Sequence, residues 1–389
     1  MDGDEISLSL RVAPKLAAID AAAWDACAGP DNPFVSYAFL SALEDSRSAS
    51  AREGWQPQHL TLAEPSGRII ACAPLYLKSH SYGEYVFDHG WAEAYERAGG
   101  AYYPKLQCAV PFSPVPGPRL LLHPEAPPET ARLMIGGMVE LARQLDVSSL
   151  HITFPTRAEW VEFGAAGLLQ RIGQQFHWEN RGYGSFEDFL GALNSRKRKA
   201  IRKERREALD SGLDIRTLTG SEITRKHWDA FFRFYMSTSD RKWGSAYLTR
   251  RFFDLLGERL GDKVVLVMAE YQGEPVAGAL NLRGTDTLYG RNWGAVGDFK
   301  FLHFEACYYR AIDYAIEHGL ARVEAGAQGT HKIQRGYLPS ETYSAHWIRD
   351  SGFARAVENF LERERPSIRA QMAALAEGSP FRQEGEKEG

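Results

Sequence analysis

The sequence has few cysteines and no long apolar run. Its 389 residues include four cysteines, which are widely separated and form no CxxC pair. Metal sites and disulfide frameworks need cysteines at close, regular spacing, so these thiols indicate a reducing compartment. No apolar run approaches the roughly 20 residues that a membrane-spanning helix requires, and the acidic residues 1–5 do not resemble a signal peptide. We therefore expect a cytoplasmic protein without a membrane span.

Motifs of several enzyme and binding classes are also absent. The eleven histidines are dispersed and form neither HxH nor HxxxH, so we expect no metal site. No GxSxG sequence occurs, which argues against an α/β-hydrolase. We also expect no DNA partner. The remaining possibilities are chemistry without a metal and recognition of a ligand.

The composition is that of a folded protein with more than one domain. Hydrophobic residues make up 44% of the chain and aromatic residues 12%, which excludes a disordered chain. Single cores stop growing at roughly 250–300 residues, so a chain of this length is expected to divide. We expect a first domain over 1–180, a second over 181–375 and a flexible tail over 376–389.

An internal repeat is the strongest feature of the sequence. Residues 60–73 align without a gap with 266–279, about two hundred residues later. Each copy has a buried strand, a turn with glycine at the same place and a second strand, which predicts a β-hairpin. Each hairpin is followed by an aromatic strand, a long amphipathic helix and a short strand. These three elements are expected at 85–87, 130–145 and 150–154 in the first half, and at 288–290, 302–318 and 322–325 in the second.

The junction between the halves carries a concentrated positive charge. Residues 196–207 contain eight Lys or Arg and two Glu, a net +6, within a chain of net −4, so all other residues together carry −10. Ala200, Ile201, Ala208 and Leu209 have helical spacing, which predicts a basic amphipathic helix over 195–209. A solvated helix and a phosphate-binding strip are equally compatible with this pattern. The candidate phosphate-binding residues are Arg196, Lys197, Arg198 and Lys199.

The second half contains the best candidate site. Loops at the carboxyl ends of strands usually hold the ligands of α/β sheets, and here a glycine-rich loop follows the strand at 321–325. His331, Lys332 and Glu305 are the candidate catalytic residues, with His331 as proton acceptor and Lys332 as the cation that stabilises an oxyanion. Glu324 is expected to pair with a cation rather than act as a base. The candidate substrate-binding residues are Tyr289, Arg291, Asn292, Trp293, Gln328 and Arg335.

A polar group in the first half has two open interpretations. His80, Glu84, Asp88 and His89 lie close together in the sequence, within a long segment rich in glycine, proline and aromatic residues. Such segments inside a compact domain are more often binding surfaces than linkers. The four side chains could line an acceptor pocket or cap turns at the surface.

The order hairpin, strand, loop, helix, strand resembles that of GNAT acyltransferases, and its duplication resembles the paired domains of the Fem family. The segments 175–178, 195–199, 302–309 and 326–332 resemble the FemAB-like predicted N-acyltransferases, described as peptidoglycan biosynthesis or recognition proteins. The resemblance covers about 32–353. It implies an α/β fold of two tandem GNAT-like domains, each a mixed sheet flanked by helices, and a transferase acting on an amine.

Departures from the GNAT pattern bear on the donor. Enzymes that use CoA hold its pyrophosphate on a compact glycine-rich turn before the long helix. In this chain the equivalent loop, 294–302, has two separated glycines followed by Asp298, which favours aminoacyl-tRNA over acyl-CoA as co-substrate. The resemblance therefore implies transfer of an acyl or aminoacyl group to an amine acceptor, such as a cell-wall precursor, with no tightly bound cofactor. A CoA-dependent N-acetyltransferase and a non-catalytic ligand-recognition protein are the alternatives.

Overall fold

The structure is a computed structural model that describes residues 8–242, 246–326 and 329–382. The chain forms two compact units. The first unit comprises residues 1–173 and 341–369, and the second comprises 174–340 and 370–389. Residues 341–369 therefore belong to the first unit. The predicted single boundary near residue 180 does not include this return of the chain.

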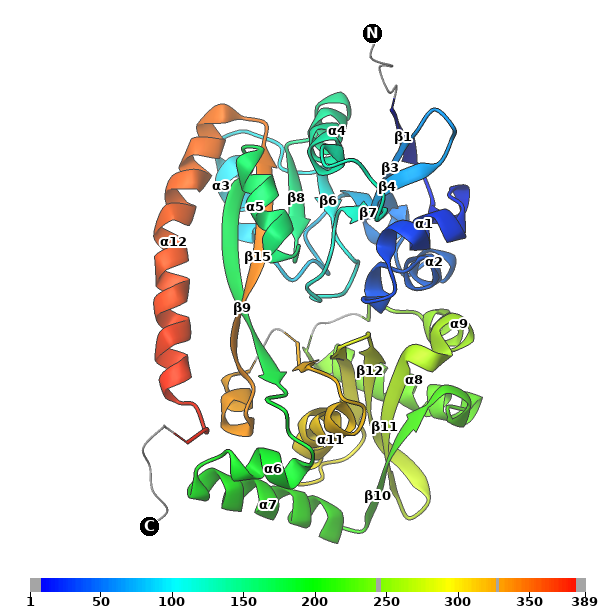
Figure 1. Cartoon of the computed structure of the whole chain (residues 1–389), viewed down its shortest axis with the longest axis vertical. Coiled ribbons are helices and arrows are strands. Elements are labelled where there is room, and N and C mark those ends of the chain that lie inside the picture. The colour runs from blue at the N-terminus through cyan, green and yellow to red at the C-terminus, as the bar shows by residue number, and fades with distance from the viewer. Residues whose placement is uncertain (1–7, 243–245, 327–328, 383–389) are drawn as a thin grey trace. The chain divides into compact units, whose positions relative to one another are not determined.

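The first unit contains two sheets and several helices (Figure 1). Antiparallel pairs give one sheet the order β1-β3-β4-β7. The other has the order β15-β8-β6-β5-β2, in which β6 and β8 are parallel. The strands are β1 (Ser9–Ala13), β2 (Trp55–Pro57), β3 (His59–Ala63), β4 (Ile69–Ala73), β5 (Leu75–Lys78), β6 (Lys105–Cys108), β7 (Leu121–Leu122), β8 (Ser149–Thr153) and β15 (Leu338–Ile348). The helices are α1 (Ala21–Ala28), α2 (Tyr37–Asp45), α3 (His89–Arg97), α4 (Thr130–Gln144) and α5 (Arg157–Ala165), and α12 (Ser351–Glu377) begins in this unit.

The β15-β8-β6-β5 part of this sheet has one apolar and one polar face. Leu106, Leu150 and Ile152 belong to the apolar face and share a buried core with Met134 and Met138 of α4. Successive strand residues point to opposite faces, so the alternate positions form the second face. That face is polar yet buried, and its residues are Tyr76, Lys78, Lys105, Gln107, Ser149, His151, Thr153, Ser344 and His346.

The second unit has one mixed sheet of order β10-β11-β12-β13-β14-β9. Only β13 and β14 among these neighbours are parallel within the described residues. Its strands are β9 (Leu169–Glu179), which starts in the first unit, β10 (Leu213–Thr219), β11 (Val264–Tyr271), β12 (Glu274–Arg283), β13 (Thr287–Ala295) and β14 (Arg322–Glu324). Its helices are α6 (Phe186–Gly191), α7 (Ser195–Asp210), α8 (Arg225–Lys242), α9 (Arg250–Leu260), α10 (Leu302–Phe304) and α11 (Arg310–Glu317), with a π-helical turn (Glu305–Tyr309) joining the last two.

The predicted repeat is confirmed in its hairpins and in its order of elements. The pair β3 and β4 corresponds to β11 and β12, and in both units a parallel strand pair brackets a long helix. The long strand β12 corresponds to β4 and β5 together. Pro74 separates β4 from β5, because proline lacks the N–H that a continuous ladder requires.

The predicted strand at 85–87 is wrong. Those residues form no strand, and the parallel partner of β8 is β6, which begins at Lys105. The first half therefore carries an additional segment and the helix α3 between the hairpin and its parallel strand. The predicted helices at 130–145 and 302–318 are confirmed, the second with a π-helical turn inside it.

Part of the expected C-terminal tail is in contact with the second unit. Of the expected tail, residues 376–382 are described, and Phe381 forms an isolated bridge with Leu193 while Arg382 donates its backbone N–H to Ala192. Residues 383–389 lie outside the described part. In the described ranges no helix is both long and apolar enough to cross a bilayer.

Candidate active site

The parallel strands β13 and β14 pair over only three positions. Thr287 to Tyr289 lie opposite Arg322 to Glu324, and β13 then continues to Ala295 while β14 ends. The pairing of β13 with β12 shifts by one residue just beyond this point, which places Arg291 and Asn292 in a β-bulge. Bulges redirect side chains and are common beside active sites. The predicted substrate-binding residues of β13 therefore follow the point where the two strands part.

A buried row of polar side chains crosses the sheet at this point. Tyr289 lies opposite Glu324, and Glu324 lies opposite His177 of β9. All three are less than a tenth exposed. Their strand neighbours Leu288, Val323 and Trp178 belong to the hydrophobic core on the other face. These three side chains thus form a polar row on one face of the sheet, and the other face of the sheet is apolar.

Glu324 and His177 have strongly altered acidities. Burial raises the pKa of Glu324 to about 8, and its Oε2 has no hydrogen-bond partner within the described residues. Burial also lowers the pKa of His177 to about 3. His177 Nε2 lies 3.2 Å from Gln175 Oε1 and 4.0 Å from Glu324 Oε1, and its Nδ1 has no partner in the described structure. At neutral pH the carboxyl is therefore mostly protonated and the imidazole is neutral.

Lys332 lies at the carboxyl end of β14. Its Nζ donates to the carbonyl of Ala325 at 2.6 Å and to that of Gly326 at 3.0 Å. Lys332 is 3% exposed, and burial lowers its pKa to about 8. Its charge also lowers the pKa of His177. The predicted cation and the buried row are therefore parts of one polar group.

His331 is exposed and lies against a cluster of half-buried and buried aromatic rings. Its Nε2 is 2.9 Å from the hydroxyl of Tyr308, and its ring contacts His303 and Phe304. The Trp293 ring is 5.3 Å from that of His303. The structure thus brings Trp293 and His331 to the same cluster, while Gln328 lies outside the described residues.

Two other predicted site residues are held in ion pairs with α7. Glu305 is fully buried and accepts hydrogen bonds from Arg205 and Arg310 at 3.0–3.1 Å. Arg335 donates to Glu204 at 2.9 Å and stacks 3.4 Å above the Phe304 ring. Both carboxylate oxygens of Glu305 are occupied, which leaves them little capacity to take a proton from a substrate. The contacts of these two side chains favour a role in holding α7 against the long helix.

The predicted basic helix is present as α7, and its charges divide into two groups. Ile201 and Ala208 are buried as expected, whereas Leu209 is 44% exposed. Further along the helix, Arg202, Lys203 and Arg205 form ion pairs with acidic side chains. The four candidate phosphate-binding residues occupy the beginning of the helix, and none of them forms an ion pair with a described residue. Cations are unfavourable at this end of a helix, where the dipole is positive, so the group is suited to an anion.

His177 was not among the residues predicted for the site, and Glu324, predicted to pair with a cation, has the neutral His177 at 4.0 Å as its ion-pair partner among the described residues. The available signals were a glutamate inside an otherwise apolar strand and a histidine between Phe176 and Trp178 in β9. Within the described ranges, no group of His, Cys, Asp or Glu is arranged to hold a metal ion.

The FemAB-like family, described as peptidoglycan biosynthesis/recognition, matches residues 15–383. The chain belongs to the FemAB-like family. No curated protein matches the chain. Among solved structures it is similar to FemX, with a TM-score of 0.55 and 12% identity over 87% of this chain and 98% of that one.

Two further similar structures share the fold at low identity. The C-terminal domain of a putative lysylphosphatidylglycerol synthetase from Agrobacterium fabrum has a TM-score of 0.55 and 10% identity, over 93% of this chain and 96% of that one. L-PGS from Bacillus licheniformis has a TM-score of 0.51 and 10% identity, over 91% and 99%. The expected fold of two tandem GNAT-like domains is confirmed, and at these identities the likeness extends to the fold alone.

Proposed function

We propose that this FemAB-like protein transfers an acyl or aminoacyl group to an amine at the site where β13 and β14 part. The observation that carries the proposal is the convergence of three buried titratable groups, Glu324, His177 and Lys332, at that point. Perturbed acidities at one place in a sheet are typical of active sites. Beyond Tyr289, β13 has no strand partner on the β14 side within the described residues.

The proposed reaction is direct attack without a covalent enzyme intermediate. The amine nitrogen adds to the activated carbonyl carbon, its proton passes to a base, and the bond to the leaving group breaks as that group takes up a proton. We assign Lys332 to the oxyanion, because a cation beside a developing charge in a buried site is strongly stabilising. Arg291 and Asn292 on the bulge, with Tyr289 and Trp293, would orient the acceptor.

The base has two candidates. His331 is exposed, and its Nε2 lies within hydrogen-bond distance of the Tyr308 hydroxyl. His177 is buried and neutral, and Glu324, protonated at neutral pH, lies 4.0 Å from it. We prefer His331 because its side chain is exposed, whereas burial moves the pKa of His177 to about 3, far below the working pH.

Two observations support aminoacyl-tRNA over acyl-CoA as donor. At the start of the long helix, the N–H groups of Leu302 and Phe304 already donate to the carbonyls of Phe299 and Phe301. Few donors therefore remain there to hold a pyrophosphate. The second observation is the group of cations at the beginning of α7, which suits an extended phosphate backbone.

The test is transfer to n-pentylamine, a simple primary amine, with radiolabelled aminoacyl-tRNA or acyl-CoA as donor and with the rate of the enzyme-free reaction subtracted. We expect product with the tRNA donor only, and loss of product on Lys332→Met. Product with acyl-CoA alone would replace this proposal with a CoA-dependent N-acetyltransferase. Saturable donor binding with no product from either donor, using several amines, would favour a recognition protein, which the family description also includes.

A further inference from the structure

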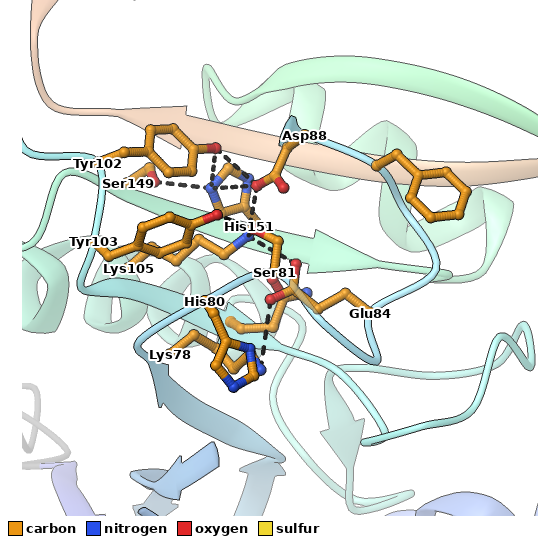
Figure 2. A network of polar contacts seen from close by, with 12 residues as sticks. Lys78, His80, Ser81, Glu84, Asp88, Tyr102, Tyr103, Lys105, Ser149 and His151 are labelled. Atoms are coloured by element: carbon orange, nitrogen blue, oxygen red, sulfur yellow. Dashed lines mark hydrogen bonds and ion pairs between the residues drawn. The ribbon is translucent and has the colours of Figure 1, made fainter. Parts of the chain in front are cut away.

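The first unit also contains a buried cluster of charged side chains (Figure 2). Lys105 Nζ donates to Ser81 Oγ and Glu84 Oε2 at 2.7 Å and to Asp88 Oδ2 at 2.5 Å. Lys78 lies 3.6 Å above the Trp55 ring and 3.8 Å from Glu84 Oε1. Each of these four charged side chains is at most 3% exposed. The lysines come from β5 and β6, and the carboxylates come from the segment between β5 and α3.

The unused hydrogen-bonding capacity of this cluster is mainly that of acceptors. All three protons of Lys105 have partners, whereas Glu84 Oε1, Asp88 Oδ1 and Gln107 Oε1 have none among the described residues. Tyr76 OH and Trp55 Nε1 are the other unpartnered atoms nearby. Buried oxygens without a partner require an explanation, because nearly all such atoms in folded proteins are bonded to protein, water or a ligand. A ligand that fits here must donate hydrogen bonds.

We propose that the first unit holds a second ligand site, in which the free oxygens of Glu84 and Asp88 accept hydrogen bonds from the ammonium group of a primary amine. The inference rests on the proposed function, because the acceptor of the transfer is the molecule that supplies an amine. An anionic ligand does not fit as well, because the donors of Lys105 are already occupied, and Lys78 Nζ donates to the carbonyl of Tyr82 at 3.2 Å and faces Glu84.

The segment that carries the two carboxylates also offers a contact surface for the rest of such a ligand. Residues 79–88 form neither helix nor strand. Tyr82 and Phe87 within it are 60% and 58% exposed, although the carboxylates between and beside them are buried. The Tyr82 and Phe87 rings lie 6.1 Å and 6.3 Å from the ring of His89. The exposed rings give an apolar rim beside the buried acceptors, which suits an alkylamine.

The cluster can bind an additional cation when Lys78 or Glu84 releases a proton. Burial lowers the pKa of Lys78 to about 7 and raises that of Glu84 to about 7. The groups that face Lys78 are Glu84, Lys105 and Asp88. Burial also lowers the pKa of His151 and of His346, so these neighbours are neutral. A bound ammonium group favours neutral Lys78 and ionised Glu84, and both changes release a proton.

The test is isothermal titration calorimetry of the full chain with n-pentylamine and, as matched control, n-pentanol. Titrations at pH 7.0 in phosphate and in MOPS, which differ in ionisation enthalpy and contain no primary amine, measure the protons exchanged on binding. We expect pentylamine to bind at least about tenfold more tightly than pentanol and to release protons. Equal binding of the two probes, no binding, or proton uptake would overturn the inference and would mean that water alone occupies the free oxygens.

Two variants with opposite expected effects keep the test independent of misfolding. Glu84→Gln is expected to weaken pentylamine binding roughly tenfold. Lys78→Met is expected to tighten it, because it removes a cation close to the ligand, and unfolding cannot produce tighter binding. Glu317→Gln, at an exposed position of the second unit, should leave pentylamine binding unchanged. Amine binding without any transfer activity would refute the proposed function and leave this site standing, whereas transfer with no amine binding in the first unit would do the reverse.

Discussion

The two parallel strand pairs, β6 with β8 and β13 with β14, occupy the same place in the repeat but carry different polar groups. In the first unit the row across the sheet is Gln107, His151 and His346. In the second it is Tyr289, Glu324 and His177. Each row lies on the face opposite an apolar core. The duplication has thus kept the sheet and its polar row, while the side chains at the row have diverged.

The two polar groups also differ in how their charges are compensated. In the first unit Lys78 and Lys105 face Glu84 and Asp88, two cations against two carboxylates. In the second unit Glu324 Oε2 has no partner within the described residues, and the nearest titratable ring, that of His177, is neutral. The first group is thus a set of paired charges, whereas Glu324 keeps its proton because burial outweighs the effect of the nearby cations Arg322 and Arg291. On this comparison we propose ligand binding for the first group and chemistry for the second.

The largest effect on stability is expected from replacing Lys105, the central cation of the buried cluster in the first unit. Lys105→Met leaves Glu84 and Asp88 buried beside a partly neutral Lys78, and breaking a buried pair in this way costs about 3–5 kcal/mol. Urea denaturation of the full chain measures the loss. Lys300→Met is the control, since Lys300 pairs with Glu207 at the surface and such pairs contribute about 0–1 kcal/mol. Equal losses in the two variants would show that the buried cluster is not a compensated unit.

The next largest effect is expected on the rate of transfer, when Lys332 of the second unit is replaced. Lys332→Met should lower the transfer rate by about 10²–10³, the range found when one group that stabilises an oxyanion is removed. Its stability loss should be near 1 kcal/mol, because only hydrogen bonds to two carbonyls disappear. His331→Ala, made beside it, tests the base separately. If the rate of Lys332→Met stays within about threefold of the wild type after correction for folded protein, Lys332 has no part in the chemistry.

A smaller effect is expected in the pH dependence of stability. The folded protein keeps a proton on Glu324 up to a pKa of about 8, whereas the unfolded chain loses it near the ordinary value of 4.5. The folded state therefore binds more protons between these values, and this contribution to stability falls as the pH rises from about 4.5 to about 8, with a slope of at most ~1.4 kcal/mol per pH unit. Glu324→Gln should flatten the fall. The exposed Glu317→Gln should not, and an identical pH profile for the two variants would contradict the raised pKa.

The sequence predicts those helices and hairpins of the two units that depend on local sequence patterns. The hairpins, the helix at 130–145 and the basic helix follow from periodicity and turn residues, which act within a few positions. The strand predicted at 85–87 is absent because Tyr85, Val86 and Phe87 have the composition of a strand but lie in a segment that forms neither helix nor strand.

The polar row could not be predicted, because it depends on contacts between distant residues. His151 and His346 have their Nδ1 atoms 2.7 Å apart and are 195 positions apart in the sequence. Lys332 was predicted from its loop, but its burial follows from hydrogen bonds to the end of β14.

The smallest effect on stability is expected at the beginning of α7. Arg196→Glu with Lys199→Glu places negative charge at the positive end of a helix dipole, which should stabilise the helix by about 0.3–1 kcal/mol per residue at low ionic strength. The same pair should weaken tRNA binding and make the salt dependence shallower, with a log–log slope smaller by roughly 0.7–0.9 for each phosphate that the helix no longer binds. Urea denaturation and filter binding across a salt series measure the two effects.

The matched control for α7 is Arg225→Glu with Lys226→Glu, because these two exposed cations occupy the first turn of α8 in the same unit. The control has the same change in net charge and the same position on a helix, so it should gain similar stability. It should keep the wild-type salt slope, because only the α7 cations are assigned to the donor. If both pairs weaken tRNA binding equally, the attraction is a general effect of net charge, and the basic strip of α7 is not a binding site.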